Sequence, residues 1–338
     1  MSRFFSRVQK QFDADIAIDL GTANTLVVQR DSGVTFNQPS VCCFSGSGAR
    51  KTLFAAGSDA SMMVGRVTRD LRIAKPLRGG VLSDMDAGRE IIRHATRHVR
   101  SGWMAGRLKA LIGVPSDATE AERRALTTAA QDAGIAKVKL LPEPLLAAIG
   151  AGLDVHEPKG RMLIDCGAGT TEVVVISLGG ICLSKTTRIG GETLDGALID
   201  YLQLRHRFQV GPIAAECLKL KIIELLEEGQ EDQQVSIRGQ HMATGLPQSI
   251  AVPCRELLIV YERHLQAIVE TVRAALHETP PELSKDIFED GITLTGGASM
   301  VNLLKDRITE STGLATRAPM EPLNSVALGL QAVLHQTR

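Results

Sequence analysis

Short apolar runs flank two similar polar turns in this chain, one in each half. The first turn spans residues 19–25 and follows the apolar run 16–18, and the second spans 165–171 and leads into the apolar run 173–176. This pattern is typical of a β-hairpin, because small residues adopt the backbone dihedrals that tight turns need. Successive N–H groups in such a turn bind anions. The pattern therefore predicts two hairpins that hold one polyphosphate from both sides.

An aspartate opens each turn, and small or hydroxyl-bearing residues fill the rest of it. Asp19 and Asp165 bring negative charge to the turn amides, which suits a hydrated Mg²⁺ that bridges phosphates. A single turn of this kind is usually only a connection, but its repetition favours a nucleotide held between two similar halves. The candidate phosphate-binding residues are Gly21, Thr22, Ala23, Asn24, Gly167, Ala168, Gly169, Thr170 and Thr171.

A strand predicted at 138–142 ends beside Glu143, which lies between two prolines. Proline fixes its own φ and restricts the residue before it, so Glu143 is expected in a stiff turn at a strand end. Proteins of the α/β class place catalytic groups at such ends. Two interpretations stay open, a surface acid in a turn and a catalytic carboxylate.

The periodicity of apolar residues predicts helices in both halves. Near the C-terminus, a strand at 291–295 leads into the small-residue turn 296–299 and the N-terminus of a helix. Glycines let a ligand approach the backbone, and a helix N-terminus offers unpaired N–H donors, so this turn is predicted to cover a nucleoside. The helices are expected at 58–65, 86–100, 119–133, 145–152, 192–207, 213–227 and 254–277.

Composition excludes several classes of protein. The chain has 338 residues, 44% of them hydrophobic and 22% charged, as in a globular protein of two ordinary domains. Lys and Arg total 38, as do Asp and Glu, and aromatic residues make up 3%, so nothing favours a nucleic-acid partner. The six cysteines show no metal-binding spacing and are expected to be buried in a reducing cytoplasm. No apolar run approaches the roughly 20 residues of a membrane span, and no signal peptide is evident.

The segment 1–12 carries an amphipathic pattern. Phe4, Val8 and Phe12 recur at helical spacing with Phe5 beside them, and basic residues lie mostly on other faces. Such a helix suits a membrane interface, where aromatic side chains enter the acyl boundary and basic residues contact anionic headgroups. The alternatives are an unstructured tail and a helix packed on the body of the protein.

Several strings along nearly the whole chain resemble the MreB family of bacterial actins, within the actin/Hsp70/sugar-kinase ATPase superfamily. They are 15–27, 37–41, 142–144, 147–153, 169–173, 188–191, 279–283 and 294–297. The resemblance implies an α/β, actin-like ATPase fold of two lobes, each with an RNase H-like core, and four subdomains. The implied boundaries are 13–40, 75–152 and 322–338 for subdomain IA, 41–74 for IB, 153–188 and 251–321 for IIA, and 189–250 for IIB, after a membrane-binding segment at 1–12.

The resemblance also implies ATP or ADP with Mg²⁺ in a cleft between the lobes. Asp19 and Asp165 match the aspartates that hold Mg²⁺ through waters. Glu143 matches the glutamate that activates the attacking water, and Thr170 matches the threonine that helps to place it. The residues implied around the nucleoside are Glu216, Cys217, Leu218 and Lys219 on one side and Gly296, Gly297, Ala298 and Ser299 on the other.

By the same resemblance, the protein is a weak ATPase that forms membrane-associated filaments, organises cell-wall elongation and maintains rod shape. Its implied location is the cytoplasm, on the inner face of the cytoplasmic membrane. The implied partners are further copies of itself, the inner membrane surface and elongation proteins such as RodZ, MreC and MreD. Family members often bind membrane through an N-terminal amphipathic helix and an apolar pair in a loop, a position that Trp103 and Met104 occupy here. Trp favours membrane interfaces.

Three departures from the family pattern bear on hydrolysis. Ala168 and Ala298 stand where glycine is usual, and Gly79 stands where an aspartate is usual. An alanine that needed positive φ would cost roughly 1–2 kcal/mol. Two alternatives therefore stay open: a divergent paralogue with weak hydrolysis, and a small-molecule phosphotransferase of the same superfamily.

Overall fold

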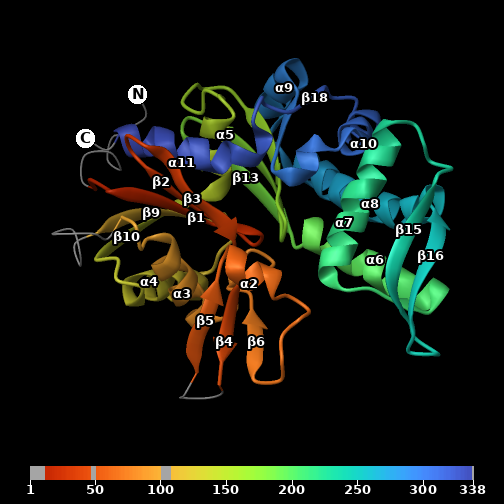
Figure 1. The fold of residues 1–338 in the computed structure, drawn as a ribbon. Coiled ribbons are helices and arrows are strands. Elements are labelled where there is room, and N and C mark those ends of the chain that lie inside the picture. The colour runs from red at the N-terminus through yellow and green to blue at the C-terminus, as the bar shows by residue number, and fades with distance from the viewer. Residues whose placement is uncertain (1–11, 47–50, 100–107, 337–338) are drawn as a thin grey trace.

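The computed structural model describes residues 12–46, 51–99 and 108–336, which form two lobes (Figure 1). The first lobe is built on a five-stranded sheet. Its strands are β1 (Ile16–Leu20), β2 (Asn24–Gln29), β3 (Gly33–Pro39), β9 (Lys109–Val114) and β10 (Lys137–Pro142). They lie in the order β3-β2-β1-β9-β10, with antiparallel pairing from β3 to β1 and parallel pairing from β1 to β10.

The second lobe repeats this topology. Its strands are β11 (Arg161–Cys166), β12 (Thr171–Ser177), β13 (Gly180–Thr187), β17 (Ile292–Thr295) and β18 (Thr316–Arg317). They lie in the order β13-β12-β11-β17-β18, again three antiparallel strands followed by two parallel ones. The two predicted hairpins are β1–β2 and β11–β12, at equivalent places in the two sheets. The prediction of two similar halves is confirmed.

Each lobe also carries a smaller sheet that protrudes from it (Figure 1). The protruding sheet of the first lobe contains β4 (Cys42–Ser45), β5 (Thr52–Ala56) and β6 (Leu71–Ala74). That of the second lobe contains β14 (Phe208–Gln209), β15 (Gln234–His241) and β16 (Pro247–Pro253). A short hairpin of β7 (Leu77–Arg78) and β8 (Val81–Leu82) completes the strands of the described residues.

The predicted helices are present with differences at their ends, but the two helices at 281–290 and 325–336 were not predicted. The helix expected at 86–100 ends at Ala95, and the buried Thr96 that follows donates its hydroxyl to the carbonyl of Ile92. Glu143 lies in the first turn of a helix rather than in a free turn. The helices are α2 (Ser58–Met62), α3 (Met85–Ala95), α4 (Glu120–Asp132), α5 (Glu143–Gly150), α6 (Gly191–His206), α7 (Pro212–Glu227), α8 (Cys254–Glu278), α9 (Pro281–Asp290), α10 (Asn302–Thr312), α11 (Ser325–Gln336) and the 3₁₀ helices η3 (Gly297–Met300) and η4 (Pro322–Asn324).

Helices α5 and α11 join the lobes at one end of the molecule. The two helices cross so closely that a Cβ on Gly150 would overlap the carbonyl of Ser325. Only glycine therefore fits at this position. Around this crossing, Ala17 of the first sheet and Val174 of the second belong to one buried apolar cluster. The lobes therefore share a core on this side, and this shared core sets the separation of the two hairpins. The four-subdomain boundaries stay a prediction.

Phe12 and the cysteines differ from expectation. Phe12 is partly buried and packs against the shared core, with Lys139 Nζ 5.8 Å from its ring centre. It contacts the body of the protein, which corrects its place among the membrane-facing residues. Cys182 and Cys217 are exposed, whereas the other four cysteines are buried as expected.

No helix in the described part of the chain combines the length and the apolar character needed to cross a bilayer.

Candidate functional site

The two hairpin turns face each other across a cavity of about 290 Å³. Each turn is closed by the same hydrogen bond, from Gly21 N–H to the Asn24 carbonyl and from Gly167 N–H to the Thr170 carbonyl. The turns also touch, since a Cβ on Gly169 would lie 2.5 Å from Thr22 Oγ1. Two sites far apart in the sequence therefore form the two walls of one cavity.

Carbonyl groups of the turns accept hydrogen bonds from other parts of the protein, whereas several amide groups of the turns have no partner among the described residues and can bind a ligand. In the second turn, Gly167 and Ala168 accept hydrogen bonds from the first amides of α6. Within the described residues, the main-chain N–H groups of residues 22, 23, 168 and 169 have no partner in the protein. All four residues line the cavity. Unpaired amides from both sides make a site for a polyanion.

Three carboxylates, Asp19, Glu143 and Asp165, line the cavity with these amides, and a fourth, Glu172, pairs with Asp165 across β11 and β12. Burial raises the pKa of Asp19 to about 7, and the nearby Asp165 carboxylate adds to this shift. Burial also raises the pKa of Asp165, against a hydrogen bond from Thr295 Oγ1 at 2.8 Å. The pKa of Glu143 lies well above its usual value, through burial first and then through repulsion from the other carboxylates. Burial raises the pKa of Glu172 to about 7.

In the described part of the chain, no lysine or arginine forms an ion pair with any of these four carboxylates. Within the same residues, no group of three or more His, Cys, Asp or Glu side chains is arranged to chelate a metal directly. Clustered acids without a basic partner repel one another, and a divalent cation relieves that repulsion. Oxygen-rich sites that keep several waters suit Mg²⁺. The donor set therefore fits a Mg²⁺ ion bound to Asp19 and Asp165 through waters.

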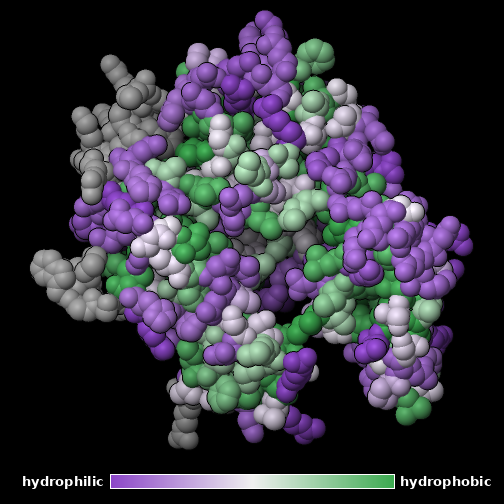
Figure 2. All heavy atoms as spheres, turned by 45° about the horizontal axis from the view of Figure 1, so that its top comes forward, coloured by the Kyte–Doolittle hydropathy of each residue, from purple (hydrophilic) through white to green (hydrophobic). Residues whose placement is uncertain are grey.

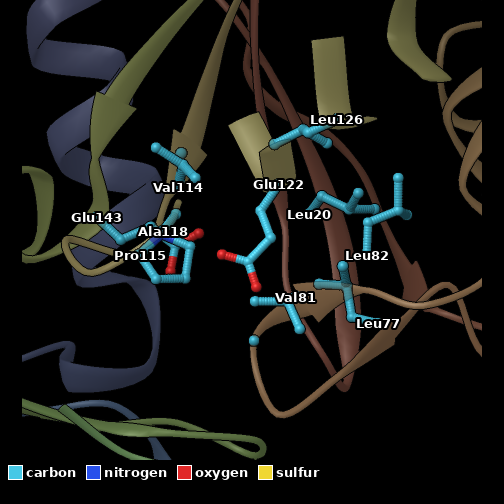
Figure 3. A pocket seen from close by; sticks show the side chains of 12 residues that line it. Leu20, Leu77, Val81, Leu82, Val114, Pro115, Ala118, Glu122, Leu126 and Glu143 are labelled. Carbon is cyan, nitrogen blue, oxygen red and sulfur yellow. The ribbon is translucent and has the colours of Figure 1, made fainter. Parts of the chain in front are cut away.

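Glu143 extends from the first turn of α5 over the end of β9. A Cβ on Gly113 would lie 2.9 Å from Glu143 Cγ, so the missing side chain makes room for the carboxylate arm. Glu143 lines both the main cavity and a smaller one of about 20 Å³ beside Val114 and Pro115 (Figure 3). A cavity of this size holds one water molecule. The carboxylate is therefore placed to contact a water at the edge of the phosphate site.

The far end of the main cavity is formed by two segments of the C-terminal third. Gly296 has φ +79° and a Cβ there would overlap the carbonyl of Cys166, so glycine is required. Its amide donates to the carbonyl of Pro322 at 3.0 Å, and the exposed Leu323 borders Gly297. The apolar rim at Leu323 suits the flat face of a nucleobase. Sequence reasoning missed η4, which has no local signal of a binding segment.

A second cavity of about 220 Å³ continues from the first, since Ala23, Asn24 and Ala168 line both. Figure 2 shows the surface hollowed between the two protruding sheets. Glu216 and Lys219 of α7 line this second cavity, and Lys219 Nζ is 2.9 Å from Asp195 Oδ2. Two exposed contacts bridge the lobes, and only the first is made by residues that line this cavity. They are the ion pair of Lys75 with Glu192 and the hydrogen bond from Arg188 Nη1 to the Gly79 carbonyl.

Five residues predicted to bind nucleotide do not line either cavity, so their role stays a prediction. Leu218 is buried in the core of the second lobe, and Thr171 donates its hydroxyl to the Ile189 carbonyl at 2.8 Å. Adjacent residues on a helix or strand point in different directions, so each string contributes only part of its length. The five residues are Thr171, Cys217, Leu218, Ala298 and Ser299.

Two of the departures from the family pattern have a structural outcome. Ala168 does not have positive φ, so its Cβ carries no backbone penalty. Gly79 has φ +55°, and its carbonyl receives the hydrogen bond from Arg188. The alanine is therefore compatible with an intact turn, and the glycine takes part in an interlobe contact.

The remaining predicted membrane residues, Phe4, Phe5, Val8, Trp103 and Met104, lie outside the described residues.

Comparisons with known proteins agree with this architecture. The chain matches the family model described as MreB/Mbl protein over residues 13–338. It is 38% identical over 321 residues to the cell shape-determining protein MreB of Escherichia coli strain K12, covering 94% of this chain and 92% of that protein. It is 32% identical over 323 residues to the cell shape-determining protein Mbl of Bacillus subtilis strain 168, covering 96% of each.

Solved structures share the fold. The crystal structure of MreB5 of Spiroplasma citri bound to AMPPNP superposes with a TM-score of 0.86 at 31% identity, covering 94% of each chain. MamK in its double helical filament superposes with a TM-score of 0.74 at 21% identity, covering 94% of this chain and 97% of that one. The fold is thus the actin-like α/β fold of two lobes. With a family model matched over nearly its whole length and relatives more than 30% identical, this chain belongs to the MreB/Mbl family.

Proposed function

We propose that this protein binds ATP with Mg²⁺ between its lobes, hydrolyses it slowly, and forms filaments whose assembly follows the bound nucleotide. The observation that carries the proposal is the pair of facing turns whose amides have no partner in the protein, set above acids with no basic partner. Amides suit phosphate oxygens and unpaired carboxylates suit a hydrated cation. A polyphosphate with its metal satisfies both at once.

Each part of the cavity then has a role. The amides of the two turns hold the phosphates, and Asp19 and Asp165 orient the waters around the cation. Bound Mg²⁺ would neutralise charge on the phosphates during transfer. Glu143 directs a water towards the phosphate chain and takes up its proton. Thr170, from the opposite lobe, helps to place that water.

Polymerisation and a role in cell shape rest on the relatives. MreB of E. coli and Mbl of B. subtilis are named cell shape-determining proteins, and MamK is seen in a double helical filament. Identical subunits joined head to tail do not close, so they build filaments. We propose that this chain does the same on the cytoplasmic face of the membrane and organises wall elongation there, with RodZ, MreC and MreD as partners.

Isothermal calorimetry with ATP and Mg²⁺, followed by high-speed pelleting, tests the proposal. We expect saturable binding of one nucleotide per chain and pelleting that depends on ATP. Gly211→Ala is a suitable control for handling, because nothing lies within 4 Å of a Cβ at that position. Absence of binding heat with adenine nucleotides would reject the nucleotide site. Binding without pelleting, together with turnover stimulated by a small-molecule acceptor, would favour a phosphotransferase instead.

Membrane attachment through segment 1–12 is tested separately. We expect Phe4→Ser with Phe5→Ser to reduce co-sedimentation with vesicles that contain anionic lipid, because marginal single anchors add up along a filament. Phe12→Ser is the comparison, since Phe12 packs on the core and its loss should lower thermal stability instead. Undiminished sedimentation of the Phe4 and Phe5 variant would remove the anchor from the proposal.

A further inference from the structure

Glu172 is a buried carboxylate of the second hairpin that lies behind the nucleotide cavity rather than in its lining. It is 1% exposed, does not line the main cavity, and pairs with Asp165 in the β11–β12 register. Thr170 stands two residues before it. A buried acid without a basic partner is costly unless it accepts hydrogen bonds, so its acceptor contacts indicate what it is retained for.

Those contacts come from the other lobe. Ser116 donates to Glu172 Oε1 through its amide at 2.9 Å and through its hydroxyl at 2.6 Å. The same hydroxyl lies 2.7 Å from Ser184 Oγ of β13. Hydrogen bonds to a carboxylate are stronger than those between neutral groups, and the accepting carboxylate is buried while Ser116 is partly exposed. The hydrogen bonds of Ser116 to Glu172 are therefore expected to hold the lobes together more strongly than the two exposed contacts between the lobes.

Ser116 also belongs to the segment that supports Glu143. It follows Pro115 directly after β9, and β9 provides the gap at Gly113 over which the Glu143 side chain lies. Pro142, which precedes Glu143, is paired with Val114 in the register of β10 and β9. Figure 3 shows Glu143 beside Val114 and Pro115. Ser116 therefore makes its contact with Glu172 from the same end of β9 that sets the position of Glu143.

We propose that Glu172 is a positioning residue, which holds Glu143 of the first lobe and Thr170 of the second in register by accepting the two hydrogen bonds of Ser116. The inference rests on the proposed ATPase activity. When the lobes separate at this point, the bonds break, and the two groups around the water lose their mutual placement. Small displacements of this kind cost large factors in rate, since proximity and orientation supply much of the catalysis.

Three variants distinguish a positioning role of Glu172 from a role in stability alone. Glu172→Ala removes the acceptor, Ser116→Ala removes one of the two donors, and Glu172→Gln keeps an acceptor oxygen while it removes the charge. Ser45→Ala is the matched control, since its hydroxyl pairs with Thr52 at an exposed site of the first lobe. Phosphate release, the ATP dissociation constant and thermal stability are measured on each full-length variant, with the pelleted fraction recorded.

We expect Glu172→Ala to lower kcat by roughly tenfold or more with little change in ATP affinity, and Ser116→Ala to lower it by a smaller factor. Glu172→Gln should restore most of the rate, and Ser45→Ala should match the unaltered protein. Unchanged kcat in Glu172→Ala and Ser116→Ala overturns the inference, as does a Gln variant as slow as the Ala variant.

Misfolding of a variant and failure of the proposed ATPase activity give results that differ from those of a wrong role for Glu172. If Glu172→Ala does not fold, the comparison of Ser116→Ala with Glu172→Gln decides in the same way. If the unaltered protein neither binds nor hydrolyses ATP, the proposed function itself has failed. Normal turnover in the unaltered protein together with normal turnover in every variant rejects only the role of Glu172.

Discussion

The two turns of the cleft have the same backbone pattern, yet they are held in place by different means. In the first lobe, Ser40 binds the turn twice, through its amide to the Ala23 carbonyl and through its hydroxyl to the Gly21 carbonyl at 2.6 Å. In the second lobe, the amides at the start of α6 bind the turn carbonyls, and Gly190 packs directly on them. Both turns are held by backbone contacts, and the first turn is held by the Ser40 hydroxyl as well.

Because the two equivalent turns are held by different contacts, they are expected to tolerate different substitutions. Side-chain support fails by leaving polar groups unpaired, which weakens the first turn without changing its shape. Backbone support fails by steric overlap, which moves the second turn. The predictions below test that contrast and the division of labour between the lobes.

The largest effect is expected where the two lobes contribute different groups to one reaction. Glu143→Gln removes the proton acceptor of the first lobe and should slow phosphate release by about 10²–10⁴-fold, with ATP binding retained. Thr170→Val, in the second lobe, should have a smaller effect because it only places the water. Single-turnover phosphate release and calorimetry measure both. Equal losses in the two variants would contradict the assignment of the base to the first lobe.

The buried acids of the two lobes predict a pH dependence of stability in the nucleotide-free, metal-free protein. Asp19 and Glu172 have pKa values of about 7 in the folded state, above those of the unfolded chain. The folded state therefore binds more protons between about pH 4.5 and 7, so its free energy of unfolding falls as pH rises through that window. The contribution of these groups is fully present below the window and lost above pH 7.

Glu172→Gln separates the share of the second lobe from that of the first. The variant carries no titrating group at this position, so it should be more stable than the unaltered protein above pH 7 by up to about 3 kcal/mol, and similar to it near pH 4.5. Denaturant titrations at several pH values measure this. A variant whose pH profile runs parallel to that of the unaltered protein would show that Glu172 does not titrate in this range.

Gly190→Ala tests backbone support of the second turn. Gly190 has extended φ, so alanine is allowed locally, but its Cβ would lie 2.6 Å from the carbonyls of Gly167 and Ala168. We expect a loss of about 1–3 kcal/mol in stability and weaker ATP binding. Gly211→Ala is the matched control, since Gly211 precedes α7 as Gly190 precedes α6 and has open space around it. Similar results for both variants would refute the close-packing argument.

Ser40→Ala tests side-chain support of the first turn. Ser40 is 1% exposed, and its hydroxyl bonds both the Gly21 carbonyl and Thr25 Oγ1. Its removal leaves buried polar groups unpaired and should cost about 1–3 kcal/mol. Ser236→Ala removes an exposed hydroxyl pair and should change stability by less than about 0.5 kcal/mol. Thermal unfolding of both variants is the measurement, and equal melting temperatures would count against a supporting role for Ser40.

The smallest effect is expected at the mouth of the cleft. The ion pair of Lys75 with Glu192 joins the lobes but is exposed to solvent, and such pairs contribute about 0–1 kcal/mol. Lys75→Ala should therefore speed nucleotide release by no more than about fivefold. Lys221→Ala, which breaks a pair with Glu224 within α7, should leave the rate unchanged. Stopped-flow release of a fluorescent nucleotide compares them, and a much larger acceleration would make this pair the main closing contact.

Local features account for the parts of the fold that could be predicted. The hairpins followed from small residues between apolar runs, and the start of α4 followed from the capping box of Thr119 and Glu122, which is present in the structure. The end of α3 at Ala95 differs from the predicted residue 100, because apolar spacing marks the interior of a helix better than its ends. The candidate site was predicted as short segments of consecutive residues. The packing of each segment in the fold decided which of its residues line the cavity.

The sequence by itself determined that two equivalent turns exist, that an aspartate opens each, and that Glu143 stands where a strand passes into a helix. Dihedral preferences and apolar spacing act over a few residues, so they can be read locally. Only the tertiary structure decided which turn amides stay unpartnered, that Ser116 meets Glu172, and that Leu218 faces inward. These outcomes depend on how the two lobes pack around their shared core, which brings together residues with no neighbouring signal in the chain.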